Sequence, residues 1–512
     1  MAAFSAQDMR NLDARNAAGA EGNPHAVALT ALAEQIAGHT ARPAYSPIVL
    51  TGFARLVDFL LIASLGVIAH ALYIGLMQSG PVLEYLVAVV GVSFVAMVLF
   101  QGLKLYQIQA LRQPVRHGPR LAGGLAAVFA GALALVFFLK LEGVLSRVWL
   151  LSWFISALIA LFLARAFFFL LVRHLTRTGR LERRTVIVGG GEAGEEVLKA
   201  LSSQADTDLR ILGVFDDRDD DRSPDVVGGY PKLGRVDDLV EFSRHTRLDL
   251  VIFTLPISAE QRLLHMLRKL WVLPIDIRLS AHSNKLRFRP RSYSYIGSVP
   301  VLDVFDKPIA DWDVVLKSAF DRVVGGLALI ALSPVMLLTA LAVKLDSRGP
   351  VFFKQKRYGF NNELIEIYKF RSMYVEQLDH AAGKLVTKGD PRVTRVGRFI
   401  RKTSLDELPQ LLNVVFKGNL SLVGPRPHAV HAKAVDRDYD EVVDGYFARH
   451  RVRPGITGWA QINGWRGETD TEEKIQRRVE YDLYYIENWS LLLDIYILML
   501  TPFALFKTEN AY

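Results

Sequence analysis

The sequence predicts a membrane protein that combines α-helical and α/β parts, and three observations lead to this fold class. Four apolar runs, each close to the roughly 20 residues that cross a bilayer, lie in the first third of the chain. A buried strand followed by spaced glycines indicates a Rossmann-like αβ domain in the middle. The last part is mixed in pattern and contains a fifth apolar run. We therefore expect a four-helix transmembrane bundle, a Rossmann-like domain, and a mixed α/β domain with a re-entrant membrane helix and interfacial helices.

The composition favours membrane segments and an anionic partner. Hydrophobic residues make up 51% of the 512 residues and the mean hydropathy is +0.21, which is high for a soluble protein. The net charge of +9 fits acidic lipid headgroups, phosphorylated substrates or nucleic acid, and only the location of the charge separates these partners. The chain has no cysteine, which excludes disulfides and thiolate zinc sites.

Residues 1–46 are rich in alanine, glycine and polar residues, so we expect a mobile tail without a cleaved signal peptide. Residues 47–175 hold the four expected transmembrane helices: Leu56–Met77, Pro81–Leu103, Leu121–Leu139 and Val148–Val172. Basic residues gather between the second and third runs and after the fourth, so the positive-inside rule places both ends of the bundle in the cytoplasm. Asp58 and Arg165 lie near the cytoplasmic helix ends, where they could pair or reach the interface.

Residues 183–304 have the pattern of a Rossmann-like domain. The expected strands are Thr185–Val188, Ile211–Phe215, Leu250–Thr254 and Ile275–Leu279. A G-x-G-x-x-G pattern follows the first strand, and an acid follows the second at the spacing of a ribose-binding residue. The candidate nucleotide-binding residues are therefore Gly189, Gly191, Gly194 and Asp216. Because such glycines also serve tight strand-to-helix packing, both interpretations stay open.

A fifth apolar run, Ala319–Leu345, opens the C-terminal part, residues 307–512. A straight span here would place everything after it on the far side of the membrane. Ser333 and Pro334 lie at its middle, and proline removes a backbone donor and kinks a helix. Both flanks are basic, which fits a hairpin that enters and leaves the same leaflet. We therefore expect a re-entrant helix over residues 319–345 that breaks at Ser333 and Pro334.

Cations are dense around two adjacent acids, Asp406 and Glu407, in the stretch between residues 389 and 427. This combination suits phosphate chemistry, because cations neutralise phosphate oxygens while one carboxylate holds a divalent metal and another acts as nucleophile. The alternative is structural, since Ser404 and Glu407 match the S-x-x-E capping box and the acids could simply open a helix. Pro409 favours a helix that begins after the acids, and both interpretations stay open.

Four motifs of this part carry a resemblance to a known family: YKFRSM, TSLDELPQLLNV, SLVGPRP and RPGITGWAQING. Together they resemble the polyprenyl-phosphate glycosyl-1-phosphate transferases, monotopic enzymes that start bacterial polysaccharide and glycan assembly. The four preceding helices extend the resemblance to the large exopolysaccharide-initiating subgroup. The resemblance implies transfer of a sugar 1-phosphate from a UDP-sugar to polyprenyl (undecaprenyl) phosphate with release of UMP. It also implies a bacterial inner-membrane protein with both soluble domains in the cytoplasm.

By this resemblance Asp406 is the nucleophile that forms a covalent phosphosugar intermediate, and Glu407 serves a Mg²⁺ ion. Arg371 and Arg426 lie inside family motifs, and Arg401, five residues before Asp406, matches an arginine associated with phosphate binding in the family. The basic residues Lys354, Lys356, Arg357 and Lys369 are further expected phosphate or headgroup contacts. The candidate substrate contacts are Arg401, Arg426, Arg371, Lys356, Arg453 and Gln461. Gly455 and Gly458 indicate a sharp loop whose role could be purely structural. The implied partners are membrane lipids and downstream glycosyltransferases of the pathway, and no nucleic acid.

Two other functions stay open. A nicotinamide-dependent nucleotide-sugar oxidoreductase or dehydratase would use the glycine-rich loop, but it leaves the Asp406 region unexplained. A non-catalytic membrane scaffold or sensor would use the Rossmann-like domain to bind a ligand. The sequence does not name the sugar, because UDP-sugars share the diphosphate and the uridine. It does not name the oligomeric state either, although four apolar helices remote from the dyad could hold a homo-oligomer together.

Overall fold

The structure, a computed structural model, describes residues 29–38, 44–73, 82–138, 145–203, 208–218, 224–255, 259–281, 294–296, 299–375, 390–427, 433–434, 437–438, 446–465 and 471–506. The chain divides into two compact units. One unit is Arg42–Glu182, and the other is Met1–Ala41 together with Arg183–Tyr512. The first unit contains the apolar helices of the bundle, and the second contains both α/β domains.

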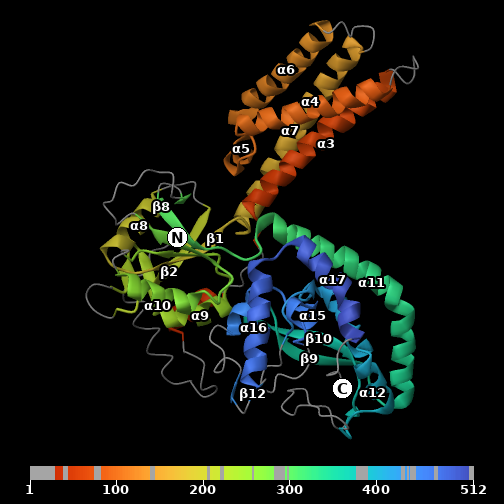
Figure 1. Ribbon diagram of the computed structural model, residues 1–512. Helices are drawn as coiled ribbons and strands as arrows, with labels where there is room; N and C mark the ends of the chain where they lie inside the picture. The colour runs from red at the N-terminus through yellow and green to blue at the C-terminus, as the bar shows by residue number, and fades with distance from the viewer. Residues whose placement is uncertain are drawn as a thin grey trace. The chain divides into compact units, whose positions relative to one another are not determined.

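Four long helices and one short helix form the first unit (Figure 1). Their bounds are α3 Pro47–Tyr73, α4 Val82–Gly102, α5 Ile108–Arg112, α6 Pro114–Phe138 and α7 Arg147–Arg177. Among the described residues, the four long helices are apolar and long enough to cross a membrane, as the four apolar runs predict. Helix α3 begins before the apolar run and α7 continues beyond it, because a nucleated helix extends into less apolar flanks.

Two tryptophans join α7 to α3 inside this bundle. Trp149 Nε1 donates to the carbonyl oxygen of Gly66 at 3.0 Å, and Trp153 Nε1 donates to that of Ile62 at 2.7 Å. Gly66 provides the room for these rings, since a Cβ there would lie 2.7 Å from Trp153. These bonds satisfy the indole N–H groups in a region where membrane excludes water.

A buried ion pair lies between the same two helices. Arg165 NH2 lies 2.5 Å from Asp58 Oδ2, and Arg165 NH1 lies 3.2 Å from Asp58 Oδ1. The two side chains are 7% and 0% exposed. A charge among apolar helices is tolerated when it is paired. The expected pairing of Asp58 with Arg165 is therefore confirmed.

An eight-stranded sheet forms the Rossmann-like domain of the second unit. Its strands are β1 Arg183–Val188, β2 Leu209–Phe215, β3 Val226–Val227, β4 Tyr230–Gly234, β5 Leu250–Phe253, β6 Asp276–Ser280, β7 Ser294–Ile296 and β8 Val299–Phe305. The order is β3-β4-β2-β1-β5-β6-β8-β7, and β4, β2, β1, β5 and β6 are parallel as in a doubly wound sheet. Helices α8 (Glu192–Ser202), α9 (Val236–His245) and α10 (Glu260–Leu270) complete the domain. The Rossmann-like prediction is confirmed, with its four expected strands.

A helix near the N-terminus, α2 (Ala31–Ala37), packs on this domain. Its buried apolar residues belong to the same core as residues of β1, β2 and α9; they are Leu32, Ala33 and Ala37. Thr30 caps the helix, and its hydroxyl donates to the carbonyl oxygen of Leu233 at 2.8 Å. The prediction of a mobile tail over residues 1–46 is therefore wrong for this segment, because its burial depends on a partner surface that local periodicity does not show. Residues 1–28 lie outside the described residues.

The remaining residues form a mixed α/β domain along one long helix, α11 (Asp311–Asp346) (Figure 1). The other elements are β9 Phe352–Tyr358, η4 Phe360–Asn362, β10 Leu364–Phe370, α12 Arg395–Lys402, η6 Leu405–Glu407, α13 Gln410–Leu412, η7 Asn413–Lys417, β11 Ser421–Val423, β12 Lys433–Ala434, β13 Arg437–Asp438, η8 Tyr446–Arg451, β14 Gly455–Thr457, α15 Trp459–Ile462, α16 Glu472–Glu487 and α17 Leu491–Phe506. Strands β9 and β10 form an antiparallel hairpin, and β11 pairs with β14 in parallel. One apolar core joins β10, α11, α16 and α17.

Helix α11 continues without interruption through Ser333 and Pro334, so the expected break at these residues is wrong. Pro334 has no N–H to donate to the carbonyl oxygen of Ile330, four residues earlier. The Ser333 hydroxyl donates to this oxygen at 2.7 Å and replaces the missing bond. The helix is bent rather than broken (Figure 1), as an internal proline commonly makes it.

The same domain holds both ends of α11. Near the amino end, Lys317 Nζ lies 2.7 Å from Asp494 Oδ2 of α17. At the carboxyl end, Arg371 NH2 donates to the carbonyl oxygen of Ser347 at 2.7 Å. Asp346 Oδ2 also accepts from the Val396 N–H of α12 at 3.0 Å. Contacts at both ends with one soluble domain are the arrangement that a re-entrant helix requires.

Candidate active site

The two adjacent acids lie on the single turn η6, between α12 and α13. Ser404, the residue before this turn, has left-handed backbone geometry with a φ of 58°, which is uncommon for a residue other than glycine. Its side chain makes no capping hydrogen bond. The capping-box interpretation is therefore wrong, and the carboxylate of Glu407 contacts side chains from other parts of the domain instead.

Glu407 forms ion pairs with two cations that are distant in the sequence. Lys369 Nζ, from β10, lies 3.0 Å from Glu407 Oε1. Arg426 NH2 lies 2.5 Å from Oε1, and its NH1 lies 3.3 Å from Oε2. The side chains of Glu407, Lys369 and Arg426 are 14%, 19% and 30% exposed, so water screens these pairs only in part. The structure thus brings together Glu407, Arg426 and Lys369.

The pKa values of the two acids are shifted in opposite directions. Burial raises the pKa of Glu407, but Arg426 and Lys369 lower it by more, and the net pKa lies well below the ordinary value. Burial raises the pKa of Asp406 to about 6; the Lys369 charge opposes this shift and the Glu407 charge adds to it. At pH 7 both carboxylates are ionised, Glu407 fully and Asp406 mostly. Among the described contacts, no cation is bonded to Asp406, so none suppresses the nucleophilicity of its carboxylate.

Asn413 fixes the strand that carries Lys369. This residue is fully buried at the start of η7. Its Oδ1 accepts from the Tyr368 N–H at 2.9 Å, and its Nδ2 donates to the carbonyl oxygen of Glu366 at 2.7 Å. These bonds tie the chain that follows the dyad to β10. A polar amide within the otherwise apolar LLNVV run is the signal that could have identified it from the sequence.

A buried ion pair supports the backbone of Arg426. Arg449 NH2 donates to the carbonyl oxygen of Arg426 at 2.9 Å and pairs with Asp482 Oδ2 at 2.5 Å. Arg449 and Asp482 are 1% and 2% exposed. Neither residue was a candidate in the sequence, because both lie outside the motifs and their pairing joins η8 to α16. Their position makes them supports of the site rather than substrate contacts.

Close backbone packing explains the glycines of the two loops beside Arg426. The Gly424 N–H donates to the carbonyl oxygen of Thr457 at 2.9 Å. A Cβ at Gly455 would lie 2.1 Å from the Gly424 nitrogen, and one at Gly458 would lie 2.3 Å from the Gly424 oxygen. No residue larger than glycine fits these positions without a shift of backbone, so the structure gives Gly455 and Gly458 a packing role.

Three of the expected phosphate contacts, Arg401, Arg371 and Lys356, form no ion pair with the dyad among the described contacts. Arg401 lies in the last turn of α12, and its charge partly opposes the rise that burial causes in the pKa of Asp406. Arg371 is 1% exposed and its NH2 donates to Ser347 at the carboxyl end of α11, and its role as a phosphate contact stays a prediction. Lys356 is exposed on β9 opposite Glu366, and no ion pair with the dyad is described for it.

Two further candidates follow η8 in the chain: Arg453 lies in the loop before β14, and Gln461 lies in α15. Arg453 NH1 donates to Ser318 Oγ of α11 at 3.4 Å. Gln461 is 8% exposed, and within the described part of the chain its Oε1 is buried without a hydrogen-bond partner. Buried polar atoms are normally satisfied, so an amide oxygen in this state favours a ligand contact. The roles of Arg453 and Gln461 as substrate contacts stay predictions.

The dyad is the part of the domain that could hold a magnesium ion. No group of three or more acidic or histidine side chains that could hold a metal occurs among the described residues. Mg²⁺ binds through one or two carboxylates together with substrate phosphates, and the dyad supplies such carboxylates. Glu407 already faces Lys369 and Arg426, so the donor set fits Mg²⁺ when an anionic diphosphate enters with it.

In the Rossmann-like domain, Asp216 already has partners. Its Oδ2 accepts from the Gly190 N–H at 2.7 Å and lies 3.0 Å from Arg218 NH2. Gly189 has a φ of 108°, and a Cβ at Gly194 would lie 2.2 Å from the Gly189 oxygen, so tight packing of α8 explains both glycines. Nucleotide binding stays a prediction for Gly189, Gly191, Gly194 and Asp216.

Comparison with known proteins finds relatives over nearly the whole chain. The model of the bacterial sugar transferase family matches residues 312–508, and that of a CoA-binding domain matches residues 101–281. A UDP-glucose:undecaprenyl-phosphate glucose-1-phosphate transferase from Xanthomonas campestris pv. campestris is 33% identical over 90% of this chain and 94% of the relative. The Escherichia coli (strain K12) protein of the same name is 38% identical over 72% of this chain and 76% of the relative. The exopolysaccharide production protein PSS of Rhizobium leguminosarum bv. phaseoli is 48% identical over 36% of this chain and 92% of the relative.

Proposed function

Because this chain belongs to the bacterial sugar transferase family, we infer that it is an undecaprenyl-phosphate sugar-1-phosphate transferase. It transfers a sugar 1-phosphate from a UDP-sugar to undecaprenyl phosphate, releases UMP, and so initiates exopolysaccharide synthesis. The family match extends from the start of α11 to the end of α17 and contains the whole candidate active site.

We propose glucose as the transferred sugar. Two relatives that are 33% and 38% identical over 90% and 72% of this chain carry UDP-glucose in their names, whereas a relative named for galactose is 30% identical over 74% of it. The contacts described around the dyad involve charges that would face the diphosphate, which all UDP-sugars share. The assignment of glucose therefore rests on the relatives, and a panel of UDP-sugar donors tests it.

The observation that carries the catalytic proposal is the charge arrangement around Asp406 and Glu407. Lys369 and Arg426 pair with Glu407, and Arg401 acts on Asp406. Three cations against two carboxylates leave an excess of positive charge, which favours a bound diphosphate. Cations placed in advance where negative charge develops are the usual means of accelerating phosphoryl transfer.

Asp406 supplies the nucleophile in the mechanism that we propose. Its carboxylate oxygen attacks the phosphorus next to the sugar, the bond between this phosphorus and the bridging oxygen breaks, and UMP leaves with the electron pair. A phosphate oxygen of undecaprenyl phosphate then attacks the same phosphorus and displaces the Asp406 carboxylate, which yields the lipid diphosphate sugar. Arg426 and Lys369 reduce the repulsion between the attacking and attacked anions.

Magnesium is the cofactor that we propose for this site. A bound magnesium ion supplies positive charge that offsets the charge of the donor diphosphate. Glu407 would hold it together with the donor's phosphate oxygens, and the low pKa of this residue keeps its carboxylate ionised over the working pH range.

An apolar surface on α11 and α17 supports a location of this domain at the membrane interface. Its exposed side chains are Val323, Leu327, Ile330, Leu337, Leu338, Leu341 and Leu345 on α11, and Leu492, Tyr496, Met499 and Phe503 on α17. Extended apolar surface of this kind marks contact with membrane or protein. We propose that α11 enters and leaves the cytoplasmic leaflet of the bacterial inner membrane, with both soluble domains in the cytoplasm. The dyad then meets a lipid acceptor and a soluble donor.

The test is a donor panel with the purified full-length protein in nanodiscs. Radiolabelled UDP-glucose, UDP-galactose and UDP-acetamido sugars are each incubated with Mg²⁺ and undecaprenyl phosphate, and UMP release and label in lipid are measured. UDP-glucose should give the highest rate, and without acceptor it should leave label on one peptide containing Asp406. Transfer from a different donor alone would overturn glucose but not the transferase. Absence of UMP release with every donor would overturn the transferase.

Two variants distinguish a specific role of Asp406 from the effect of removing any carboxylate of this domain. Asp406→Asn should abolish labelling of the peptide and lower turnover by a factor of roughly a hundred to a thousand, as loss of a strong catalytic group does. Glu480→Gln, an exposed carboxylate of α16 that pairs with Arg477, should leave both unchanged. If UMP appears only when donor and acceptor are both present, the lipid phosphate attacks directly and Asp406 has another role.

A further inference from the structure

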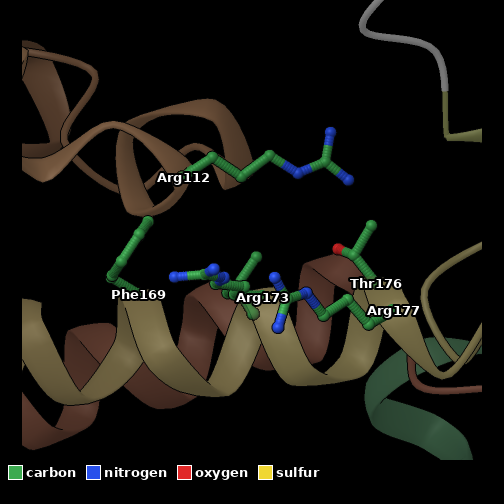
Figure 2. Close-up of a pocket in the computed structure, with 6 residues that line it drawn as sticks. Arg112, Phe169, Arg173, Thr176 and Arg177 are labelled. Atoms are coloured by element: carbon green, nitrogen blue, oxygen red, sulfur yellow. The ribbon is translucent and has the colours of Figure 1, made fainter.

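A pocket of about 240 Å³ lies in the bundle between α5 and α7, in the unit that does not contain the dyad. Its lining residues are Arg112, Phe169, Val172, Arg173, Thr176 and Arg177. Arg112 ends α5, and the other five belong to the last third of α7. Figure 2 shows the Arg112 side chain extending along the face of α7 that carries Thr176 and Arg177, so that the two helices close the pocket from opposite sides.

Three guanidinium groups give this pocket its charge. None of its described lining residues is a carboxylate. Within the described residues, no carboxylate partner appears for Arg173 or Arg177. The carboxyl end of α7 contributes only about half a negative charge, which the three arginines outweigh. The pocket therefore presents the planar, multiply donating groups that bind phosphate oxygens.

A hydroxyl in the same pocket has no partner. Thr176 Oγ1 is buried and makes no hydrogen bond within the described residues. A helical threonine normally donates to a carbonyl three or four residues earlier, as Thr178 does to His174 at 3.0 Å. A buried hydroxyl that lacks even this bond costs free energy unless a ligand supplies an acceptor. Thr176 thus adds a neutral donor to the arginines.

The rest of the lining is apolar, and this distinguishes a lipid phosphate from a soluble one. Val172 is 1% exposed, and Phe169 lies three residues before it on the same helix. Helix α7 is one of the candidate membrane spans, and its basic end is the one that the positive-inside rule assigns to the cytoplasm. A ligand here meets cations at the level of the headgroups and apolar side chains toward the bilayer centre.

We propose that this pocket binds the phosphate of an anionic phospholipid from the cytoplasmic leaflet, with the acyl chains along Phe169. Basic pockets between membrane helices on this side suit acidic headgroups. Arginines at the ends of membrane helices also occur simply because their side chains reach the interface, without forming a site. The buried hydroxyl of Thr176 and the position of Arg112 on a second helix separate the two cases, because a general attraction to the interface requires neither.

The experiment measures lipid binding by the purified full-length protein. Nanodiscs of phosphatidylcholine alone and with phosphatidylglycerol are compared by thermal unfolding of the bundle, and lipids retained after detergent extraction are identified by native mass spectrometry. Phosphatidylglycerol should raise the unfolding temperature and remain bound. The double variant Arg173→Gln/Arg177→Gln should weaken its binding by about 25-fold, at about fivefold for each arginine near a headgroup. Thr176→Val, which is nearly isosteric, should weaken binding without changing charge.

The matched control removes the same charge from the same side of the membrane. Arg116 and Arg120 are exposed on α6 near its amino end and do not line the pocket, so Arg116→Gln/Arg120→Gln should retain the lipid. Equal loss in both double variants, with no effect of Thr176→Val, would overturn the pocket in favour of general attraction.

Two further arms identify the source of the phosphate. Inorganic phosphate added to phosphatidylcholine nanodiscs should not reproduce the stabilisation, and if it does, the site binds free phosphate and the lipid assignment is wrong. Undecaprenyl phosphate that binds in an arginine-dependent way, while phosphatidylglycerol does not, would assign the pocket to the acceptor lipid instead. All variants should unfold at the wild-type temperature in pure phosphatidylcholine, which shows that they fold.

Discussion

The Ser333 hydroxyl donates a hydrogen bond of 2.7 Å to the carbonyl oxygen of Ile330, the oxygen that Pro334 leaves without its helical donor. The serine and the proline therefore act together. The proline bends α11, and the serine removes the cost of an unsatisfied carbonyl in apolar surroundings. This bond allows an uninterrupted helix to have both ends held by one domain.

A double-mutant cycle tests this coupling. Ser333→Ala should lower the unfolding temperature and the activity in nanodiscs, since loss of the bond costs about 1 kcal/mol or more. Pro334→Ala restores the N–H, so Ser333→Ala should have little further effect in that background. Additive effects of the two substitutions would contradict the coupling.

The re-entrant topology predicts that both ends of α11 face the cytoplasm. Asp313 and Arg348 are exposed beside the two ends, and the native chain has no cysteine. Asp313→Cys and Arg348→Cys should resist an impermeant thiol reagent added outside intact cells, whereas Ser79→Cys, between the first two membrane helices, should react. Labelling of Arg348→Cys from outside would show that α11 spans the bilayer. Lys317 is unsuitable as a probe because it pairs with Asp494.

The raised pKa of Asp406 predicts a pH dependence of the first half-reaction. Attack requires the ionised carboxylate, so formation of the labelled peptide should rise with pH through about 6 and level off above 7. The measurement omits undecaprenyl phosphate, because phosphomonoesters titrate in the same range. A rate that stays constant from pH 5 to 8 would contradict this role of Asp406.

Asp406 should also make folding stability depend on pH: stability should fall as the pH rises, whereas the rate of the first half-reaction should increase. Its folded-state pKa of about 6 exceeds the ordinary value of 3.8, so the protonated form favours folding. The stability that Asp406 contributes is complete below the ordinary value and is lost as the pH rises through 6. Asp406→Asn cannot ionise, and it should unfold at a higher temperature than wild type above pH 6, while the two should converge toward pH 4. Identical melting curves throughout would contradict the shift.

Arg449 should act through the position of Arg426. Arg449→Met leaves the buried Asp482 unpaired, which costs about 3–5 kcal/mol, and it also releases the carbonyl oxygen of Arg426. The double variant Arg449→Met/Asp482→Leu should recover part of the stability, since it removes the unpaired carboxylate, although Arg478 loses its attraction to Asp482. It should still show a raised KM for the UDP-sugar, because Arg426 loses its support. Full recovery of KM in the double variant would make the pair purely structural.

A fragment that begins near Lys307 should retain transferase activity in nanodiscs. The PSS relative aligns over 92% of its length with only 36% of this chain, and the described active-site contacts all lie after Lys307. The fragment loses the pair between Lys307 and Asp249 and the bond from Asn361 to Ser243, so we expect lower stability. Loss of all activity in a folded fragment would show that the N-terminal half takes part in the site.

Local patterns along the chain predict the membrane helices, the strands of the Rossmann-like domain and the Asp406–Glu407 dyad. Each of these depends on local pattern: length and hydropathy for a helix such as α7, glycine spacing after β1, and a motif for the dyad. These signals lie within a few residues of one another, so they can be read without knowledge of the fold.

The tertiary structure alone decided which side chains meet. Lys369, on β10, pairs with Glu407, whereas Arg371 lies one residue past the end of the strand and donates to Ser347 at the end of α11. The helix at Ala31–Ala37 forms because the Rossmann-like core covers its weakly apolar face. Ion pairs and burial join residues that are far apart in the sequence, and their free energy depends on distance in space. Local pattern therefore predicted the reacting groups, and only the fold assigned their partners.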